Sequence, residues 1–448
     1  MPCSLPFFAT LATIQEVDGW LTFDESIDAT LKSRIYVRQS YREISDSILS
    51  TLPTPTSLRQ HAIVTGTPGI GKSLFLFYLL WRLLQLKQRV FLVYGKYHIY
   101  FDGKGGVFEI NVPDWRNHDF WTPDLWCLFD AAYRKEIGLP CSQCSFILAT
   151  SPRRDLVNDF KKGPPPPPVY YMPIWSKEEM ASVATTLYPD LGGVWEERFR
   201  ILGGIPRYVL EDPSTEATLL LSQACRQCDL NDCIKVIGLH STITEKSKVF
   251  HSLIHVISTS PYHSSSVQYA SPVALDIIVR EKGEQARMEM HSLLASCRGN
   301  PLASSLCGYI FEPYAMDMLE KGGTFKCREL VGGRQGRRSI SEIDVPASSG
   351  ARVVADRVEE GQTPNQLYVP KTSNYTAIDA WMPGFGGFQM TVGKRHEIKG
   401  GADLDLGMLG DGGNCLYWVL PPLYFYDFTK KTPQSINQFA LMIPYPTD

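Results

Sequence analysis

The chain has 448 residues, 44% hydrophobic and 20% charged, which is typical of a globular protein with two or three domains. Its net charge of −3 excludes nucleic-acid binding through overall charge, so any DNA contact must come from a local patch. No segment reaches the roughly 18 apolar residues of a membrane-spanning helix, so no contact with a membrane is expected. The N-terminal segment lacks a basic region and prolines interrupt it, so the sequence predicts no secretory signal peptide there.

The 11 cysteines favour reduced thiols, because their number is odd and they are scattered over a long chain. The pairs Cys141/Cys144 and Cys225/Cys228 have the C-x-x-C spacing of zinc sites. The two pairs lie far apart in the sequence, and Cys144 falls on an expected core strand. Structural thiols are therefore favoured over a metal site.

Changes in composition divide the chain into four predicted regions. Residues 1–58 are a lead-in with one amphipathic helix near Tyr36–Leu52, and residues 59–215 carry the nucleotide motifs. Residues 216–300 are expected to be helical. In residues 301–448 glycine and aromatic residues become more frequent and short strand-like runs replace long helices.

One motif near the start of the second region specifies both a local fold and a ligand. Residues 66–73 fill every fixed position of the phosphate-binding loop G-x-x-x-x-G-K-[ST]. A strand is expected before it at His61–Thr65, and an apolar helix after it at Leu74–Leu84. The glycines let successive N–H groups point at a phosphate, and the helix adds its positive N-terminal end.

The loop residues have separate expected roles. Lys72 is expected to reach the β- and γ-phosphates, and the Ser73 hydroxyl to bind Mg²⁺. The sequence therefore predicts ATP and Mg²⁺ as cofactors, bound by Gly66, Thr67, Pro68, Gly69, Ile70, Gly71, Lys72 and Ser73.

A second acid is expected to complete the magnesium site. The apolar run Leu125–Asp130 predicts a strand that ends in Asp130, where the carboxylate holds Mg²⁺. Many hydrolysing proteins of this class place a glutamate directly after that aspartate, whereas this chain has Ala131 and Ala132. Nucleotide binding is therefore a firmer prediction than hydrolysis.

Further polar residues are candidates for contact with the γ-phosphate. The strand expected at residues 145–150 ends in Thr150 and is followed by Ser151 and Arg153. The turn Gly203–Arg207 presents Arg207 on a rigid backbone. Arg207 is either a cis arginine finger or part of a turn that only joins two helices.

The last region contains a candidate metal-dependent nuclease site. Restriction-type nucleases use an acid on one strand and an acid-x-Lys pattern on the next, often with a glutamate from a preceding helix. Glu312 lies on an expected helix at residues 303–319, and Asp379 ends an expected strand at residues 375–379. Gln389 and Thr391 lie on the next expected strand, at residues 387–392.

In this reading Asp379 and Gln389 bind Mg²⁺, and Thr391 occupies the lysine position. Lys394 is then the candidate for the water-positioning group, with His396 and Lys399 as alternatives. A glutamine has no charge, so the affinity for Mg²⁺ should be lower than with an acid. In the alternative, Asp379 caps a turn and Gln389 packs in a sheet.

The order and spacing of several short stretches resemble the Crinkler effectors of oomycetes and fungi and the related retrotransposon hot spot proteins. The resemblance runs from about Ile35 onward and rests on residues 35–38, the loop with its helix at 74–81, and residues 149–153, 171–176, 203–207, 311–312, 377–379 and 388–392.

The resemblance implies an α/β chain in which an AAA/STAND-like P-loop NTPase domain, a helical region and a restriction-endonuclease-like domain follow one another. It implies an effector or toxin whose ATP-binding module, itself an ATPase, controls a Mg²⁺-dependent nuclease acting on DNA. The expected place of action is the nucleus of a host cell, reached after secretion by an unidentified route. Host nuclear proteins and a homo-oligomer are further implied partners. The alternative is a nucleotide-dependent switch with an inactive nuclease-fold domain.

Overall fold

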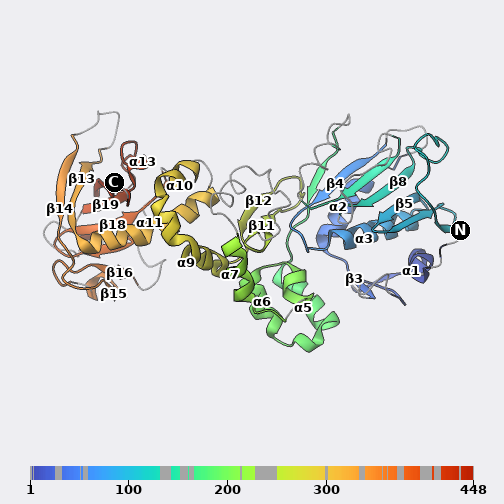
Figure 1. The fold of residues 1–448 in the computed structure, drawn as a ribbon, viewed down its shortest axis with the longest axis horizontal. Coiled ribbons are helices and arrows are strands. Elements are labelled where there is room, and N and C mark those ends of the chain that lie inside the picture. The colour runs from blue at the N-terminus through green and yellow to red at the C-terminus, as the bar shows by residue number, and fades with distance from the viewer. Residues whose placement is uncertain are drawn as a thin grey trace. The chain divides into compact units, whose positions relative to one another are not determined.

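The described part of the chain has a mixed α/β fold with four sheets (Figure 1). The chain forms two compact units, Met1–Asp229 with Leu239–Ile277, and Leu230–Gly238 with Ile278–Asp448. The computed structural model describes residues 3, 5–25, 33–50, 52–53, 59–131, 143–151, 160, 166–211, 214–227, 250–297, 301–331, 339–355, 357–360, 362–370, 378–393, 406–407, 415–432 and 435–446.

A seven-stranded sheet forms the centre of the first unit, in the order β10-β4-β9-β8-β5-β6-β7. The first five strands in this order are parallel, β6 pairs antiparallel with β5, and β7 pairs antiparallel with β6. The expected strands before and after the loop are confirmed. The strands are β4 (His61–Thr65), β5 (Arg89–Tyr94), β6 (Tyr97–Phe101), β7 (Val107–Glu109), β8 (Leu125–Asp130), β9 (Ser145–Ala149) and β10 (Val169–Tyr171).

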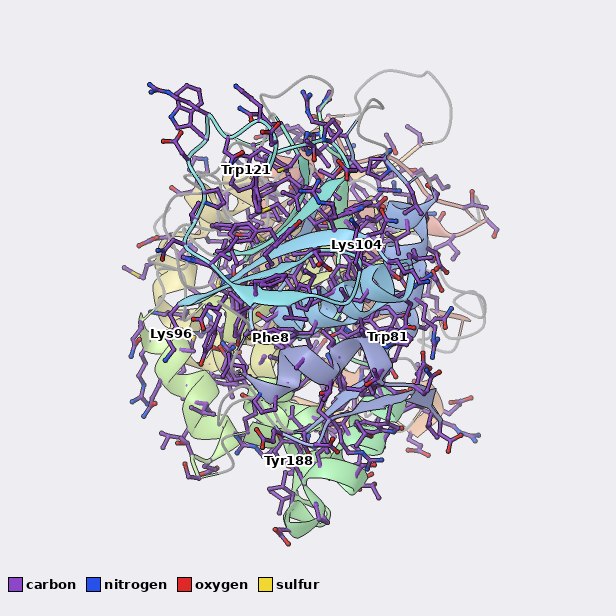
Figure 2. All side chains as sticks on the ribbon, turned by 90° about the vertical axis from the view of Figure 1, so that its right-hand side faces the viewer. Phe8, Trp81, Lys96, Lys104, Trp121 and Tyr188 are labelled. Atoms are coloured by element: carbon purple, nitrogen blue, oxygen red, sulfur yellow. The ribbon has the colours of Figure 1, made fainter. Side chains whose placement is uncertain are left out.

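The central strands are apolar along their whole length because both faces of the sheet are covered. Every residue of β8 is buried, and alternate side chains join two separate apolar clusters. One cluster includes the helix α3 (Lys72–Gln85), which packs against β5 and β8, together with Phe8. The other includes Trp121. Figure 2 shows Trp121 and Phe8 on opposite sides of the strands.

The N-terminal part of the unit covers the α3 side of the sheet. It consists of α1 (Pro6–Thr10), η1 (Leu11–Thr13), an antiparallel sheet of β1 (Glu16–Val17), β2 (Trp20–Thr22) and β3 (Arg34–Tyr36), and α2 (Gln39–Leu49). The helix expected near Tyr36–Leu52 is therefore shorter than predicted. Tyr36 pairs with Trp20 in the small sheet, so the helix can begin only after that strand.

Helices follow β10 in the first unit. They are α5 (Lys177–Leu187), η3 (Pro189–Leu191), α6 (Val194–Leu202), the π-helix η4 (Arg207–Glu211) and α7 (Ala217–Gln227). The segment 216–300 was expected to be helical, but it also contains the 3-10 turn η6 (Phe250–Ser252) and an antiparallel hairpin of β11 (Ile254–Ile257) and β12 (Ser266–Tyr269). The β-branched residues of β11 favour this strand.

Three helices lie next in the chain: α9 (Pro272–Met288), α10 (Met290–Cys297) and α11 (Pro301–Lys321), and the last confirms the helix expected at residues 303–319. The second unit contains an eight-stranded sheet in the order β14-β13-β20-β19-β18-β17-β16-β15. Its elements are β13 (Gly323–Glu329), β14 (Ser341–Val345), β15 (Val353–Ala355), η7 (Val358–Glu360), β16 (Tyr368–Pro370), β17 (Ala380–Met382), β18 (Gly386–Met390), β19 (Cys415–Leu420), α13 (Pro422–Phe425) and β20 (Asn437–Met442).

In the antiparallel hairpin β17–β18, Gln389 of the candidate nuclease site lies on β18, and β19 runs parallel to β18. Asp379 was expected to end a strand, but it directly precedes β17, and residues 371–377 lie outside the described residues. Its backbone N–H donates to Phe388 O at 2.8 Å, which starts the pairing of the hairpin. In the described part of the chain, no helix has the length and apolar character needed to cross a membrane.

Candidate functional site

The glycine loop, Gly66–Ser73, joins β4 to α3 in the first unit and has the curled backbone that its sequence predicts. Gly66, Gly69 and Gly71 all have positive φ values, of 145°, 85° and 95°. A Cβ atom on Gly66 would lie 2.7 Å from Met172 O, and one on Gly71 would lie 2.5 Å from the Tyr41 hydroxyl. Glycine is therefore required both by conformation and by the close approach of neighbouring atoms.

Lys72 begins α3 and turns its side chain back into the loop. Its Nζ atom donates to Gly66 O and Thr67 O, both at 2.9 Å. The pKa of Lys72 is lowered to about 7, mainly by burial; the nearby charge of Asp130 acts in the opposite direction, and that of Arg207 adds to the lowering. The loop carbonyls thus hold the lysine where an incoming anion can displace them.

A cavity of about 370 Å³ opens over the loop and brings together most of the predicted nucleotide residues. Ser73 and Asp130, which supply the oxygen donors that Mg²⁺ prefers, line the same cavity. The predicted residues in its wall are Pro68, Gly69, Gly71, Lys72, Ser73, Asp130, Thr150 and Arg207.

Three predicted residues have other surroundings. Ile70 is buried in the apolar cluster next to α3, the Thr67 side chain accepts a hydrogen bond from β11, and a Cβ on Gly66 would meet Met172. Arg153 lies outside the described residues. Beyond the loop, the cavity wall also has an apolar part, which includes Trp175, Val183, Leu187, Tyr188 and Leu210. Tyr188 lies at the end of α5 (Figure 2).

Two elements fix the carbonyl groups of the glycine loop. The Tyr41 hydroxyl on α2 donates to Gly71 O at 2.6 Å, and Trp175 Nε1 donates to Ile70 O at 2.8 Å. Both rings are buried. The loop therefore keeps its shape through contacts with side chains that lie far from it in the sequence.

A buried arginine holds Trp175 in place. The Arg38 guanidinium lies 4.9 Å from the centre of the Trp175 ring and forms two hydrogen bonds with the Glu179 carboxylate, at 2.8 and 2.9 Å. It also donates to Pro173 O and Ile174 O. These hydrogen bonds of the buried guanidinium all go to the segment of residues 173–179, which contains Trp175.

The sequence reasoning did not assign functions to Tyr41, Trp175, Arg38 or Glu179. A signal for one of them was present, because Ser176 and Glu179 form a capping box at the start of α5 whose spacing can be read from the sequence. The pairing of Arg38 with Glu179 spans 141 residues and could not be read in that way.

The C-terminal candidate site is only partly assembled among the described residues. Asp379 Oδ2 accepts hydrogen bonds from Gln389 Nε2 at 2.7 Å and from the Met390 N–H at 2.8 Å. Asp379 and Gln389 are therefore direct neighbours across the hairpin. The Thr391 hydroxyl accepts from the Gly393 N–H at 3.2 Å and so closes a local turn.

Of the remaining members of the expected nuclease site, the structure describes Glu312. Glu312 lies at the surface of α11, and burial by the surrounding protein raises its pKa above the ordinary value. Lys394, His396 and Lys399 lie outside the described residues. Within the described ranges, no group of three Asp, Glu, His or Cys side chains is arranged to hold a metal ion.

We expect Arg38→Ala to destabilise the protein by about 3–5 kcal/mol, because it leaves the Glu179 carboxylate without its buried partner. Urea denaturation measures this loss. The matched control is Arg42→Ala, which removes a partly exposed ion pair with Glu16 and should cost about 1 kcal/mol or less. Equal losses in both variants would contradict the assigned role of Arg38.

Comparison with known proteins identifies the family. The chain matches no protein family model. It is 51% identical over 446 residues to Crinkler effector protein 15 of Phytophthora infestans and 50% identical over 446 residues to Crinkler effector protein 16 of the same organism. Each match covers 99% of this chain and 72% of the relative, so the similarity also includes the residues before Ile35. The chain therefore belongs to the Crinkler effector family.

Proposed function

We propose that this Crinkler-family effector binds a nucleoside triphosphate, with ATP as the expected ligand, at the glycine loop of its first unit. The observation that carries this proposal is that Lys72, Ser73 and Asp130 line one cavity above a loop with the required backbone curl. The parallel order of the sheet supports the same function, because β8 and β9 bring Asp130 and Thr150 to the edge where the loop lies.

The residues of this cavity fit a magnesium–nucleotide complex. Ser73 and Asp130 would hold Mg²⁺, which would neutralise the charge that develops on the phosphates. Lys72 and Arg207 would bind phosphate oxygens, and Thr150 would contact the terminal phosphate. Ala131 follows Asp130 and carries no carboxylate, so we propose tight binding with slow hydrolysis. Such a module works as a switch.

Lys72→Ala should weaken the binding of magnesium–ATP at least about tenfold, because it removes a charge-assisted hydrogen bond to the phosphates. Isothermal titration calorimetry measures the affinity. Lys104→Ala is the control, since Lys104 is an exposed lysine of the same unit outside the cavity wall (Figure 2). Unchanged affinity in Lys72→Ala would remove the proposal, and parallel titrations with GTP would give the preferred base.

Nucleotide binding should be accompanied by proton uptake above neutral pH. In the protein without nucleotide, burial lowers the pKa of Lys72 to about 7, and bound phosphates favour its charged form. The complex therefore holds more protons than the free protein above about pH 7, and the affinity should fall by up to about tenfold per pH unit. Titrations at pH 8 in Tris and in HEPES measure the proton uptake, and identical heats after correction for ligand dilution would contradict it.

A second candidate function is supported by the hydrogen-bonded pair of Asp379 and Gln389. We propose that the second unit is a Mg²⁺-dependent nuclease for DNA, controlled by the nucleotide site, in the nucleus of a host cell. Host nuclear proteins and a second copy of the chain are further proposed partners. The proposal is supported by the hairpin β17–β18, which brings Asp379 and Gln389 together beside the parallel strand β19. The competing proposal is a nuclease fold that binds but does not cut.

Asp379→Asn should abolish cleavage of double-stranded DNA in the presence of Mg²⁺, because it removes the charged metal ligand. Gln389→Glu should increase cleavage at low Mg²⁺ by restoring a second charge. Agarose gels of purified chain with DNA, with and without ATP, measure both effects, with Asp344→Asn on β14 as the control. If neither the natural chain nor Gln389→Glu cleaves DNA, the nuclease proposal is wrong and the binding proposal remains.

A further inference from the structure

The β11–β12 hairpin, Ile254–Tyr269, contacts the glycine loop from outside the cavity. The Val256 N–H on β11 donates to Thr67 Oγ1 at 2.9 Å, and both residues are buried. Thr67 and Val256 are 189 residues apart in the sequence but belong to the same compact unit. This bond is a direct link between the loop and an element that had no expected role.

Thr67 accepts two hydrogen bonds, one on its backbone carbonyl and one on its side chain. Its carbonyl accepts from Lys72 Nζ at 2.9 Å, and its hydroxyl accepts from β11. If a phosphate group draws Lys72 away from the loop carbonyls, the first of these bonds is lost. The bond to β11 is then the contact that keeps the Thr67 side chain in position.

The same hairpin also packs against the turn that carries Arg207. A Cβ atom on Gly203 would lie 2.4 Å from Ala270 O and 2.7 Å from the His255 ring, so the hairpin lies directly on this glycine. The turn that carries Arg207 also contacts the glycine loop, since a Cβ on Gly69 would lie 3.0 Å from the Arg207 Cβ. The hairpin thus contacts both segments that supply phosphate-binding side chains.

Two buried histidines, His251 in η6 just before the hairpin and His255 on β11, add no positive charge near Lys72. Burial lowers the pKa of His251 to about 4, with a further contribution from the charge of Lys72, and lowers that of His255 to about 3. Both rings are therefore neutral at neutral pH. A neutral, buried wall can lie close to the lysine without weakening its attraction for phosphate.

Three further hydrogen bonds hold the loop of the hairpin and the segment that follows it. The Tyr171 N–H on β10 donates to Tyr262 O at 2.7 Å, which ties the hairpin loop to the edge of the large sheet. The Ser271 hydroxyl donates to Ile201 O at 2.6 Å and accepts from the Ala274 N–H at 3.0 Å, so it caps α9 and joins it to α6. The hairpin is therefore fixed independently of the glycine loop.

We propose that the β11–β12 hairpin is a positioning element of the nucleotide site and that Thr67 is the positioning residue that couples the glycine loop to it. The inference rests on the proposed nucleotide binding. The hairpin holds the loop in the curled form while Lys72 exchanges its carbonyl partners for phosphate oxygens, and it keeps the Arg207 turn beside the loop.

The test compares Thr67→Val with Thr67→Ser in the full chain. Valine keeps the shape of threonine but leaves the Val256 N–H without its acceptor, whereas serine keeps the hydroxyl. Hydrogen–deuterium exchange without nucleotide should be about tenfold faster in Thr67→Val at Val256 and at the loop amides, and nearly unchanged in Thr67→Ser. Magnesium–ATP affinity should fall about tenfold in Thr67→Val and recover in Thr67→Ser.

The outcomes separate this inference from the proposed function. Unchanged loop exchange in Thr67→Val overturns the positioning role, whatever the affinity for ATP. Faster exchange with full ATP affinity also overturns it, because the link would then be structural only. If the natural chain binds no ATP, the proposed function fails and the role in nucleotide binding fails with it, while the exchange data still show whether the hairpin holds the loop.

If Thr67→Val does not fold, a measurement on the unmodified chain tests the same inference. The Val256 amide should exchange about tenfold more slowly with saturating magnesium–ATP than without it, because the occupied loop holds the Thr67 hydroxyl more firmly. Equal exchange in the two states would overturn the inference.

Discussion

The proposed nucleotide site depends on side chains outside the glycine loop that hold the loop in shape. Its backbone has three residues with positive φ values, and its carbonyls at Ile70 and Gly71 accept hydrogen bonds from Trp175 and Tyr41. Isolated glycine-rich segments lose much conformational entropy when they adopt one shape. Because the surrounding rings hold the loop, this entropy is lost when the protein folds and not when a ligand binds. The loop is therefore already curled before binding.

The buried cation Arg38 connects this loop to the helix α5. Its hydrogen bonds to Glu179, Pro173 and Ile174 are formed in a place where an unpaired charge would be costly. The arrangement makes the position of Trp175 depend on the N-terminal segment that contains Arg38. The segment expected to be a simple lead-in is therefore part of the site, since Arg34 also lies in the cavity wall.

In the second unit, the candidate metal ligand Asp379 also shapes the backbone. Its carboxylate accepts the Met390 N–H and the Gln389 amide, and its own N–H donates to Phe388 O. Both donors bind the same oxygen, Oδ2, and they place Gln389 beside the candidate metal ligand. The same contacts fit the alternative in which Asp379 caps a turn and Gln389 packs in the sheet. Cleavage, rather than geometry, separates the two.

The sequence allowed the loop, its strand and its helix to be predicted because the motif combines a local fold with a local pattern of apolar residues. The same is true of the strand that ends in Asp130 and of the helix that carries Glu312. The Tyr41, Trp175 and Val256 contacts could not be predicted, because each joins segments distant in sequence through a single hydrogen bond. The hairpin β11–β12 was missed because its strands are short and lie between helices.

The candidate nuclease site was predicted less accurately than the glycine loop, for a related reason. A restriction-type site needs residues from a helix and two strands, and short strands have weak sequence signals. Gln389 was placed on the correct strand, whereas Asp379 precedes its strand instead of ending one. The side chains expected to complete the site include Lys394, which is outside the described residues.

The most direct test of the central claim is an experimental structure of the chain with Mg²⁺ and a non-hydrolysable ATP analogue. We expect the triphosphate in the curl of the glycine loop, with Lys72 Nζ moved from Gly66 O and Thr67 O to the phosphate oxygens and the metal beside Ser73 and Asp130. An analogue bound elsewhere, or Lys72 still bonded to the loop carbonyls at saturating analogue, would contradict the account.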